Sequence, residues 1–549
     1  MIETKIIYQD VSPTGKLVST YSGVNIEPYS DYKNVLNNEK NETEDITTLE
    51  HNIWSLDGTK RLFPDNASSI TWGLVSNTIS GIDGFFADGE EPQLVVEFTD
   101  LQESVGITFD FDIFKSDYPT RTRITYYNGS QVLDDAIYDC DNAESFTFVK
   151  EVSSYNKIVV KFLKTKLPYR RLRLINIYYG ITRIFGHEEL NNVSSIEEVN
   201  SISSELSINT LDFNVRNTSA IPFLFQKMQS ISLMYGDELM GTYYIDESNR
   251  LAVNNYDVNC IDDVGILDLS QFNGGLYRNK NAVELIDEIM ADTRVNYSVS
   301  EELANSVVSG YIPICKKREA LLYVCFAIGA VADTSRSAEI KIKKLSDVST
   351  KTFDYEETFQ EGSVSKEGKV TKVQLTAYSY AETSEPSKEL YKGTLNAGEN
   401  TITFSTPYYD YSITGGTILD SGVNFVKIKV ASAGEVVLKG KDYIETQLIF
   451  SKDNPTVKST DVQKVVESST CKLVNTDNVN DVLERLYDYC MRTEKIEAKA
   501  IIDNTVAVGD VVNIPTSYDE VVPCRVTRFK LGFGASKVFA EIEGELMTE

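Results

Sequence analysis

The chain has 549 residues, a length that allows two to four domains, and its content of 42% hydrophobic and 25% charged residues is ordinary for a globular protein. Its 53 basic and 82 acidic residues give a formal net charge of -29, which repels phosphate backbones and excludes tight nucleic-acid binding. Such acidity suits the wall of a channel through which a polyanion slides, and it equally suits a protein that must stay soluble at high concentration.

Residue usage also limits the chemistry that we expect. The sequence has seven cysteines, at 140, 260, 315, 325, 471, 490 and 524. They form no CxxC pair, and their odd number leaves at least one without a disulfide partner, so we expect buried thiols instead of disulfides or a zinc site. Only two histidines are present, His51 and His187, which disfavours a hydrolase or a metalloenzyme. We therefore predict no catalytic residue, no cofactor and no metal ligand.

The first residues carry no targeting signal that we can identify. The start, MIETKIIYQD, lacks a basic flank followed by an apolar stretch, and no apolar run approaches the roughly 20 residues that span a bilayer. We expect no membrane segment, and synthesis and assembly in the cytoplasm.

The residue pattern of the N-terminal third changes near residue 49. Residues 1–48 predict one strand, Thr4 to Tyr8, followed by a polar linker. Residues 49–180 contain short alternating segments, among them QLVVEF, TRITYY and NKIVVKF, separated by turn signals such as Asn128-Gly129. Evenly spaced short strands of this kind predict a jelly-roll β-sandwich.

The middle of the chain mixes strands with two helices. Within 181–350, segments such as SISLMYGDELMGTYYI predict strands, and apolar residues recur at helical spacing over Ala282–Ala291 and over about Lys317–Val331. Residues 351–460 return to strands and predict a second β-rich domain.

The last segment, 461–549, predicts one amphipathic helix, Val479–Thr493, followed by a β-meander that ends the chain. The whole chain is therefore expected to be mainly β with a few helices, an α+β protein in the broad sense.

Several motifs could carry chemistry, and each has a simpler structural interpretation. Asp262 and Asp263 could act as an acid-base pair if burial separated their pKa values, but a turn at a strand end is favoured. His187 could pair with a cysteine nucleophile, but a surface histidine at a domain junction is favoured. The GFG at 532–534 opens a strand and not a helix, so we expect a hairpin turn and no phosphate site.

An acidic cluster lies at the start of the C-terminal helix. It lacks the glycine and glutamate that an EF-hand requires, so we expect a helix N-cap in which Asn478 or Asn480 accepts a backbone hydrogen bond. The cluster consists of Asn475, Asp477, Asn480 and Asp481. The 31 tyrosines and 24 phenylalanines could stack on sugars, but cross-strand packing is favoured.

Three segments together resemble tail proteins of phages that infect Gram-positive bacteria: TLEHNIWSLDG at 48–58, ITWGLVSNTISG at 70–81 and LQESVGITFDFD at 101–112. The family pattern is a Trp-Leu-Asp-Gly start, a turn ending in Ser-Gly, and a strand pair after Ser-x-Gly-Ile. The matching residues are Trp54, Leu56, Asp57, Gly58, Ser80, Gly81, Ser104, Gly106 and Ile107.

Downstream segments look like the baseplate hub proteins of contractile tails. They include IEEVNSISSELSINTLDFNV, DVNCIDDVGILD, SGYIPICKKREALLYVCFAIGA and the closing VGDVVNIP and CRVTRFKLGF, and they cover most of 180–350 and the end of the chain. Residues 350–450 resemble nothing that we can name.

The resemblance implies a homotrimer around a central channel, in which a duplicated pair of tail-tube-like β-barrel domains meets the tail tube above and a spike or tip protein docks below. It also implies other baseplate proteins as neighbours, a place in the virion or in a phage tail-like bacteriocin, and a galactose-binding (discoidin-like) jelly roll inserted at 49–180. A sugar site and a packing spacer are both open for this insert. Some relatives continue into a peptidoglycan-cutting domain, and we expect none here because the chain ends at Glu549 after the meander.

Two other functions are weighed against the structural hub. A carbohydrate-binding adhesin, or distal tail protein, would use residues 49–180 to contact a host surface glycan, with the remainder as a mount. A tail-associated hydrolase is disfavoured by the low histidine count.

Overall fold

The computed structural model of the protein describes most of the chain, and contacts between residues divide it into two compact units. Unit 1 is Met1–Lys5, Gly186–Pro222 and Ser232–Glu549, and unit 2 is Ile6–Phe185 and Phe223–Ile231. The residues whose structure is described are 3–10, 19–29, 46–48, 61–63, 72–111, 118–139, 145–179, 181–216, 225, 227–252, 254–293, 295–458, 460–501, 505–518, 520–533 and 538–547. His51, Trp54, Cys140 and Gly534 lie outside them.

The chain is mainly β with a few helices, which confirms the predicted fold class. The described helices are α2 (Asp263–Ile266), α3 (Ala282–Met290), α4 (Lys317–Ile328) and α5 (Val479–Met491), with two short 3-10 turns at Leu267–Leu269 and Glu301–Leu303. Among the residues described, no helix is long and apolar enough to cross a membrane.

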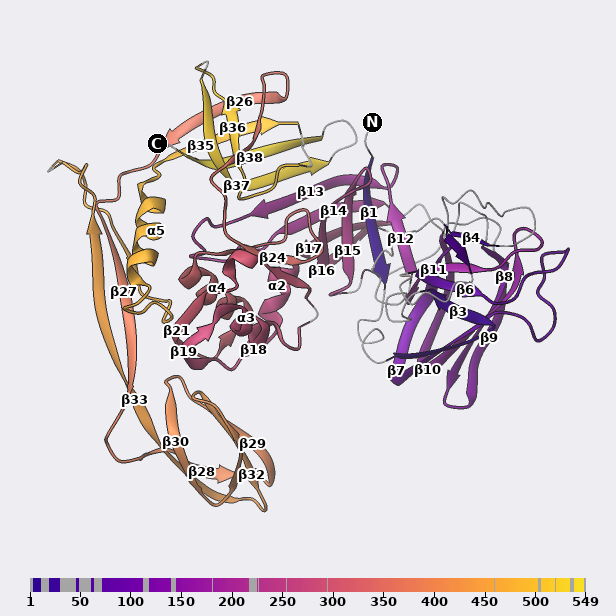
Figure 1. Ribbon diagram of the computed structural model, residues 1–549, viewed down its shortest axis with the longest axis horizontal. Coiled ribbons are helices and arrows are strands. Elements are labelled where there is room, and N and C mark those ends of the chain that lie inside the picture. The colour runs from indigo at the N-terminus through magenta and orange to yellow at the C-terminus, as the bar shows by residue number, and fades with distance from the viewer. Residues whose placement is uncertain are drawn as a thin grey trace. The chain divides into compact units, whose positions relative to one another are not determined.

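Unit 2 is built around one strongly bent antiparallel sheet in the order β3-β6-β11-β7-β10-β8-β9, with β2 added to β7 (Figure 1). The two longest strands, β7 and β10, pair along most of their length, and their register shifts between Val149 and Lys157, which lets one sheet fold over a core. Two of its strands, β2 and β3, lie on the N-terminal side of residue 49. The strands of this sheet are β2 (Ser19–Val24), β3 (Ile26–Tyr29), β6 (Trp72–Ser76), β7 (Gln93–Phe111), β8 (Pro119–Asn128), β9 (Gln131–Asp139), β10 (Ser145–Thr165) and β11 (Arg173–Tyr179).

Aromatic side chains fill the core of unit 2. The rings of Phe109 and Phe148 meet edge to face with centroids 5.4 Å apart, and those of Tyr126 and Tyr155 do so at 5.1 Å. For these rings, the expected cross-strand packing of aromatics is confirmed. Smaller pairings complete the described strands of the N-terminal region: β1 (Thr4–Asp10) with β12 (Ile181–Phe185), and β4 (Ile46–Thr48) with β5 (Arg61–Phe63).

In unit 1, two antiparallel sheet regions are joined through one pair of strands. The first has the order β15-β16-β17-β14-β13, and β13 also pairs with β37 of the second, whose order continues β37-β38-β35-β26. Strand β36 pairs with β37, and a bridge from Gly362 in β26 to Thr516 brings this second region back on itself as a small barrel.

The first region consists of β13 (Leu190–Glu198), β14 (Thr210–Arg216), β15 (Ser230–Tyr235), β16 (Glu238–Ala252) and β17 (Asn255–Ile261). The second consists of β25 (Ser349–Thr352), β26 (Thr358–Lys366), β35 (Glu494–Ala500), β36 (Val511–Pro515), β37 (Val521–Phe533) and β38 (Val538–Leu546). Strands from before residue 460 and after residue 461 therefore share one barrel.

A helical layer lies between these regions in sequence. Helix α3 begins where the Asn281 side chain accepts hydrogen bonds from the backbone N–H groups of Val283 (2.8 Å) and Glu284 (3.3 Å), and α4 ends where Gly329 adopts a φ of 73°. The apolar faces of both helices are buried in one core. Short strands surround them: β18 (Gln271–Phe272), β19 (Gly275–Asn281), β20 (Tyr297–Val299), β21 (Val307–Ile312), β22 (Cys315–Lys316), β23 (Val331–Asp333) and β24 (Ile340–Lys343).

Two long strands leave this core. Helix α5 packs along β27 (Lys372–Glu382) and the end of β33 (Gly434–Asp453), and β34 (Val465–Ser468) pairs with β27 (Figure 1). We call the paired residues 372–382 and 443–453 the arm.

The first half of β33 belongs to a small domain, residues 388–442, with its own core. Its strands are β28 (Lys388–Leu395), β29 (Gly398–Thr403), β30 (Tyr408–Thr414), β31 (Thr417–Ser421) and β32 (Phe425–Val430). The buried Asn424 ties this domain to the helical layer, since its Nδ2 donates to the carbonyl of Asn273 at 2.8 Å and its Oδ1 accepts from the Tyr311 hydroxyl at 2.7 Å.

Candidate functional site

The most concentrated buried polar chemistry of unit 1 centres on an ion pair between Glu197 and Arg336. Glu197 stands on β13 in the same register as buried Val193 and Ser195, so the alternation of the strand turns its carboxylate into the core. Its Oε1 lies 2.9 Å from Nη1 of Arg336, while its Oε2 has no hydrogen-bond partner among the described residues. Burial raises the pKa of Glu197 to about 7, and the nearby guanidinium only partly offsets this.

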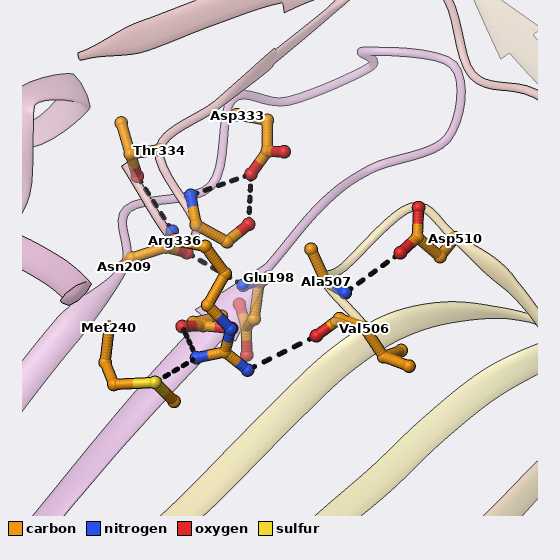
Figure 2. Close-up of polar contacts among 11 residues, drawn as sticks. Glu198, Asn209, Met240, Asp333, Thr334, Arg336, Val506, Ala507 and Asp510 are labelled. Carbon is orange, nitrogen blue, oxygen red and sulfur yellow. Dashed lines mark hydrogen bonds and ion pairs between the residues drawn. The ribbon is translucent and has the colours of Figure 1, made fainter. Parts of the chain in front are cut away.

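Arg336 reaches this carboxylate from the loop after β23. Its backbone is left-handed, with a φ of 53°, and its guanidinium also lies 3.6 Å from Sδ of Met240 and 3.4 Å from the carbonyl of Val506 (Figure 2). The side chain of Arg336 therefore joins its own loop to three other segments: β13, β16, which carries Met240, and the segment that precedes β36.

Asp333 holds the loop in this shape. Its carboxylate accepts hydrogen bonds from the backbone N–H of Ser335 at 2.9 Å and from the Ser335 hydroxyl, and it forms an ion pair with Lys343 at 2.8 Å. A left-handed conformation at a residue with a side chain is strained and persists where surrounding contacts over-determine it. These bonds to Ser335 supply such contacts next to Arg336.

Asp262 and Asp263 lie just after β17, at the strand end where the sequence predicts them. Asp262 caps α2 by accepting from the N–H of Gly265 at 3.0 Å, and it also accepts from the N–H of Asn209 at 3.1 Å and the hydroxyl of Thr334 at 2.6 Å. Burial raises the pKa of Asp262 to about 6 and that of Asp263 to about 7. Thr334 sits two residues before Arg336, so both carboxylate sites hold the same loop.

This arrangement is suited to joining segments. Asn209 donates to the Thr334 hydroxyl at 2.8 Å and accepts from the N–H of Glu198 at 2.8 Å, which extends the network back to β13 (Figure 2). We define the buried network as Glu197, Asn209, Asp262, Asp333, Thr334 and Arg336. Its hydrogen bonds join β13, the end of β17 and the loop after β23, while Oε2 of Glu197 and Nε of Arg336 have no hydrogen-bond partner among the described residues.

A separate cavity of about 220 Å³ lies on the other side of β13. Five glutamates line it, and two arginines pair with them: Arg528 lies 2.7 Å from Glu198 and also contacts Glu543, and Arg492 lies 3.3 Å from Glu545. The lining residues include Glu198, Glu205, Glu497, Glu543 and Glu545, with Lys495 beside them. Within the described part of the chain, no group of three acidic, histidine or cysteine side chains is arranged to hold a metal ion.

The acidic cluster at the start of α5 is structural. Asn478 is the N-cap residue and its Oδ1 accepts a backbone hydrogen bond, as predicted, but the donor is the N–H of Asn475 at 2.8 Å and not an N–H of the helix. Asn475 in turn donates to the carbonyl of Ser309 at 2.8 Å and so links the start of α5 to β21. His187 is exposed, next to the chain position where the two units divide.

Sequence reasoning did not single out Glu197 or Arg336. In VSSIEE, at 193–198, the odd-numbered residues are valine, serine and glutamate, and the even-numbered residues are serine, isoleucine and glutamate. The two faces of the strand are therefore equally polar, and the pattern does not tell which face is buried. The partner lies 139 positions away in a loop, where no periodicity applies.

No family model and no curated protein matches the chain. Among solved structures, the chain is similar to the prophage MuSo2 43 kDa tail protein from Shewanella oneidensis, at 8% identity over 66% of this chain and 94% of that one, with a TM-score of 0.41. It is also similar to a tail protein from Neisseria meningitidis MC58 (9% identity, 66% and 93% covered, TM-score 0.44) and to prophage tail protein gp18 from Listeria monocytogenes EGD-e (10%, 66% and 91%, 0.38). The structural similarity is thus to phage tail proteins, at low identity.

Proposed function

We propose that this chain is a structural subunit of the baseplate hub of a contractile phage tail or phage tail-like particle. In this proposal three copies surround a central channel, meet the tail tube on one side, hold a spike or tip protein on the other, and contact other baseplate proteins around them. The chain carries no catalytic role.

The observation that carries the proposal is the joined pair of sheet regions in unit 1. One region comes from residues 190–261 and the other from 349–366 and 494–546, and they meet where Ser194–Glu198 of β13 pairs with Arg528–Gly532 of β37. Two β regions side by side in each of three subunits would present six to a hexameric tube, as the hub resemblance implies. The buried network supports the same role, because it fixes the helical layer against both regions.

The proposal predicts where the protein sits in an assembled particle. Gold-labelled antibodies against this chain should mark one end of purified tails, the end distal to the head or collar, in electron micrographs. Label along the whole tail, or only on free protein, would contradict a hub position.

A specific feature of unit 2 favours a second candidate function, attachment to a host surface glycan. Two aromatic side chains, Phe85 and Tyr169, are 37% and 38% exposed, and both are fixed beside Gly81, whose N–H donates to the carbonyl of Phe85 at 2.7 Å and whose carbonyl accepts from the N–H of Tyr169 at 3.3 Å. The Nζ of Lys164 lies over one face of the Phe85 ring, 4.8 Å from its centroid, so the opposite face of this ring would be the one that stacks on a sugar.

If this surface binds glycan, Phe85→Ala should weaken retention of the full chain on purified host cell walls by roughly 2- to 10-fold, since one ring contact contributes about 0.5–1.5 kcal/mol. Ile137→Ala, at an exposed apolar side chain on β9, is the matched control and should bind as the wild type does. Equal retention of both variants, or none by the wild-type chain, would remove the adhesin candidate and leave the hub proposal intact.

A further inference from the structure

The outer edge of the arm is open. Strand β33 pairs with β28 from Gly434 to Gly440 and with β30 from Val437 to Asp442, but from Tyr443 to Asp453 it pairs only with β27. The other edge of this stretch has no strand partner among the residues that the structure describes. Its outward N–H and C=O groups are therefore available to a further strand.

The side chains along this edge are not those of a protected edge. All residues from Ile444 to Ile449 are exposed, and three of them are large and apolar, with Ile444 exposed by 54%, Leu448 by 47% and Ile449 by 71%. The only charged residue among them is Glu445. Its carboxylate forms an ion pair with Lys472 at 2.8 Å and accepts a hydrogen bond from the Tyr380 hydroxyl at 2.8 Å.

Monomeric proteins protect such edges with lysines, prolines, bulges or inward charges. The pairing of β27 with β33 shows no register shift from Lys372–Asp453 to Glu382–Tyr443, so no bulge turns the edge away. Strand β9, an edge strand of unit 2, shows the contrast: its pairing with β8 shifts register between Tyr126 and Tyr127, and it carries three carboxylates among its exposed apolar residues.

We propose that the open edge of β33 pairs with a strand from a second copy of this chain, an inference that rests on the proposed ring of three. Copies that each carry a net charge of -29 repel one another, so they can meet only where charge is absent or paired. One face of the arm meets this condition: its exposed residues, Ser379 and Ala381 of β27 and Ile444, Thr446 and Leu448 of β33, carry no charge, and the neighbouring Ala377 is buried in the helical core. A site for a basic partner would instead present free carboxylates.

In a closed ring each interface joins two different surfaces of neighbouring copies. The sheet of the arm has the order β33-β27-β34, so β34 lies at the edge opposite to β33. Its Val465 is exposed, and β27 is its one strand partner in the described structure. β34 of the next copy is therefore the strand that meets β33, and the sheet continues from copy to copy.

The test measures the mass of the full-length chain by light scattering over a range of concentrations, together with hydrogen exchange of the amides from Ile444 to Ile449. The wild type should have the mass of three copies. Those amides of this stretch that point to the open edge, and not to β27, should exchange at least 10-fold more slowly in the assembled protein than after dilution. Ile449→Lys and Val465→Lys should each reduce the mass to that of one copy. Val132→Lys, on the β9 edge, should leave it at three.

The outcomes separate this inference from the proposed function. A trimeric Ile449→Lys variant, or equal exchange rates in assembled and diluted wild type, would overturn the pairing of β33 while leaving the hub proposal standing. Loss of assembly by Ile449→Lys but not by Val465→Lys would overturn the choice of β34. A wild type of one copy at every concentration would contradict the ring itself. Because exchange is measured on the wild type, the result holds even if a variant fails to fold.

Discussion

Arg336→Ala should lower the free energy of unfolding at pH 7.5 by about 3–5 kcal/mol, because removal of one partner leaves the other as an uncompensated buried charge. Glu197 is fully buried, and Arg336 is its ion-pair partner at 2.9 Å. Without the guanidinium, Glu197 must take up a proton to remain in the core. Urea unfolding followed by circular dichroism measures the loss.

Two controls separate this effect from a general loss of contacts. Lys388→Ala removes an ion pair of similar length, 2.8 Å to Asp442, in which both side chains are about half exposed, and it should cost less than about 1 kcal/mol. The double variant Glu197→Leu/Arg336→Met replaces both charges by apolar groups and should lie within about 2 kcal/mol of the wild type. A loss below about 1 kcal/mol for Arg336→Ala would show that the buried pair does not hold β13 and the loop after β23 together.

The second large effect that we expect concerns pH: the free energy of unfolding should rise as the pH falls from 8 to about 5. Burial raises the pKa of Glu197 from 4.5 to about 7, that of Asp262 from 3.8 to about 6 and that of Asp263 from 3.8 to about 7. A carboxyl with a raised folded-state pKa binds protons more tightly in the folded protein. Its stabilising contribution is therefore complete below the unfolded pKa and is lost as the pH rises through the folded pKa.

Between pH 8 and 5.5 we expect the free energy of unfolding to increase by at least about 2 kcal/mol. A tenfold gain in proton affinity on folding contributes about 1.4 kcal/mol, and neighbouring carboxyls partly cancel one another. Acidification also reduces the overall negative charge, which favours folding in the same direction. Glu197→Gln isolates the buried group, because this variant should show a shallower slope than the wild type. Equal slopes for the two proteins, or a steady loss of stability on acidification over this range, would contradict the assignment.

The helices could be predicted closely from the sequence because their signals are local. Predicted spans of 282–291 and 479–493 became Ala282–Met290 and Val479–Met491, and the one predicted to Val331 stops at Ile328. It stops early because Gly329 turns left-handed, a C-terminal signal that the apolar periodicity concealed. Local propensity and capping were sufficient for these elements.

The strand partners could not be predicted because pairing depends on contacts between distant residues. β26 pairs with β35, from Thr358–Ala500 to Lys366–Glu494, although the sequence places them in successive β-rich segments. β33 is continuous through two sheets, which no turn signal reveals. The buried network could not be predicted for the same reason, because Glu197 and Arg336 become partners only when the chain folds.

The measurement that tests the hub proposal most directly is electron microscopy of the purified full-length chain at micromolar concentration. Class averages viewed down the axis should show rings with threefold symmetry around an open channel. A population made up only of single, asymmetric particles the size of one 61.5 kDa chain would contradict the proposal.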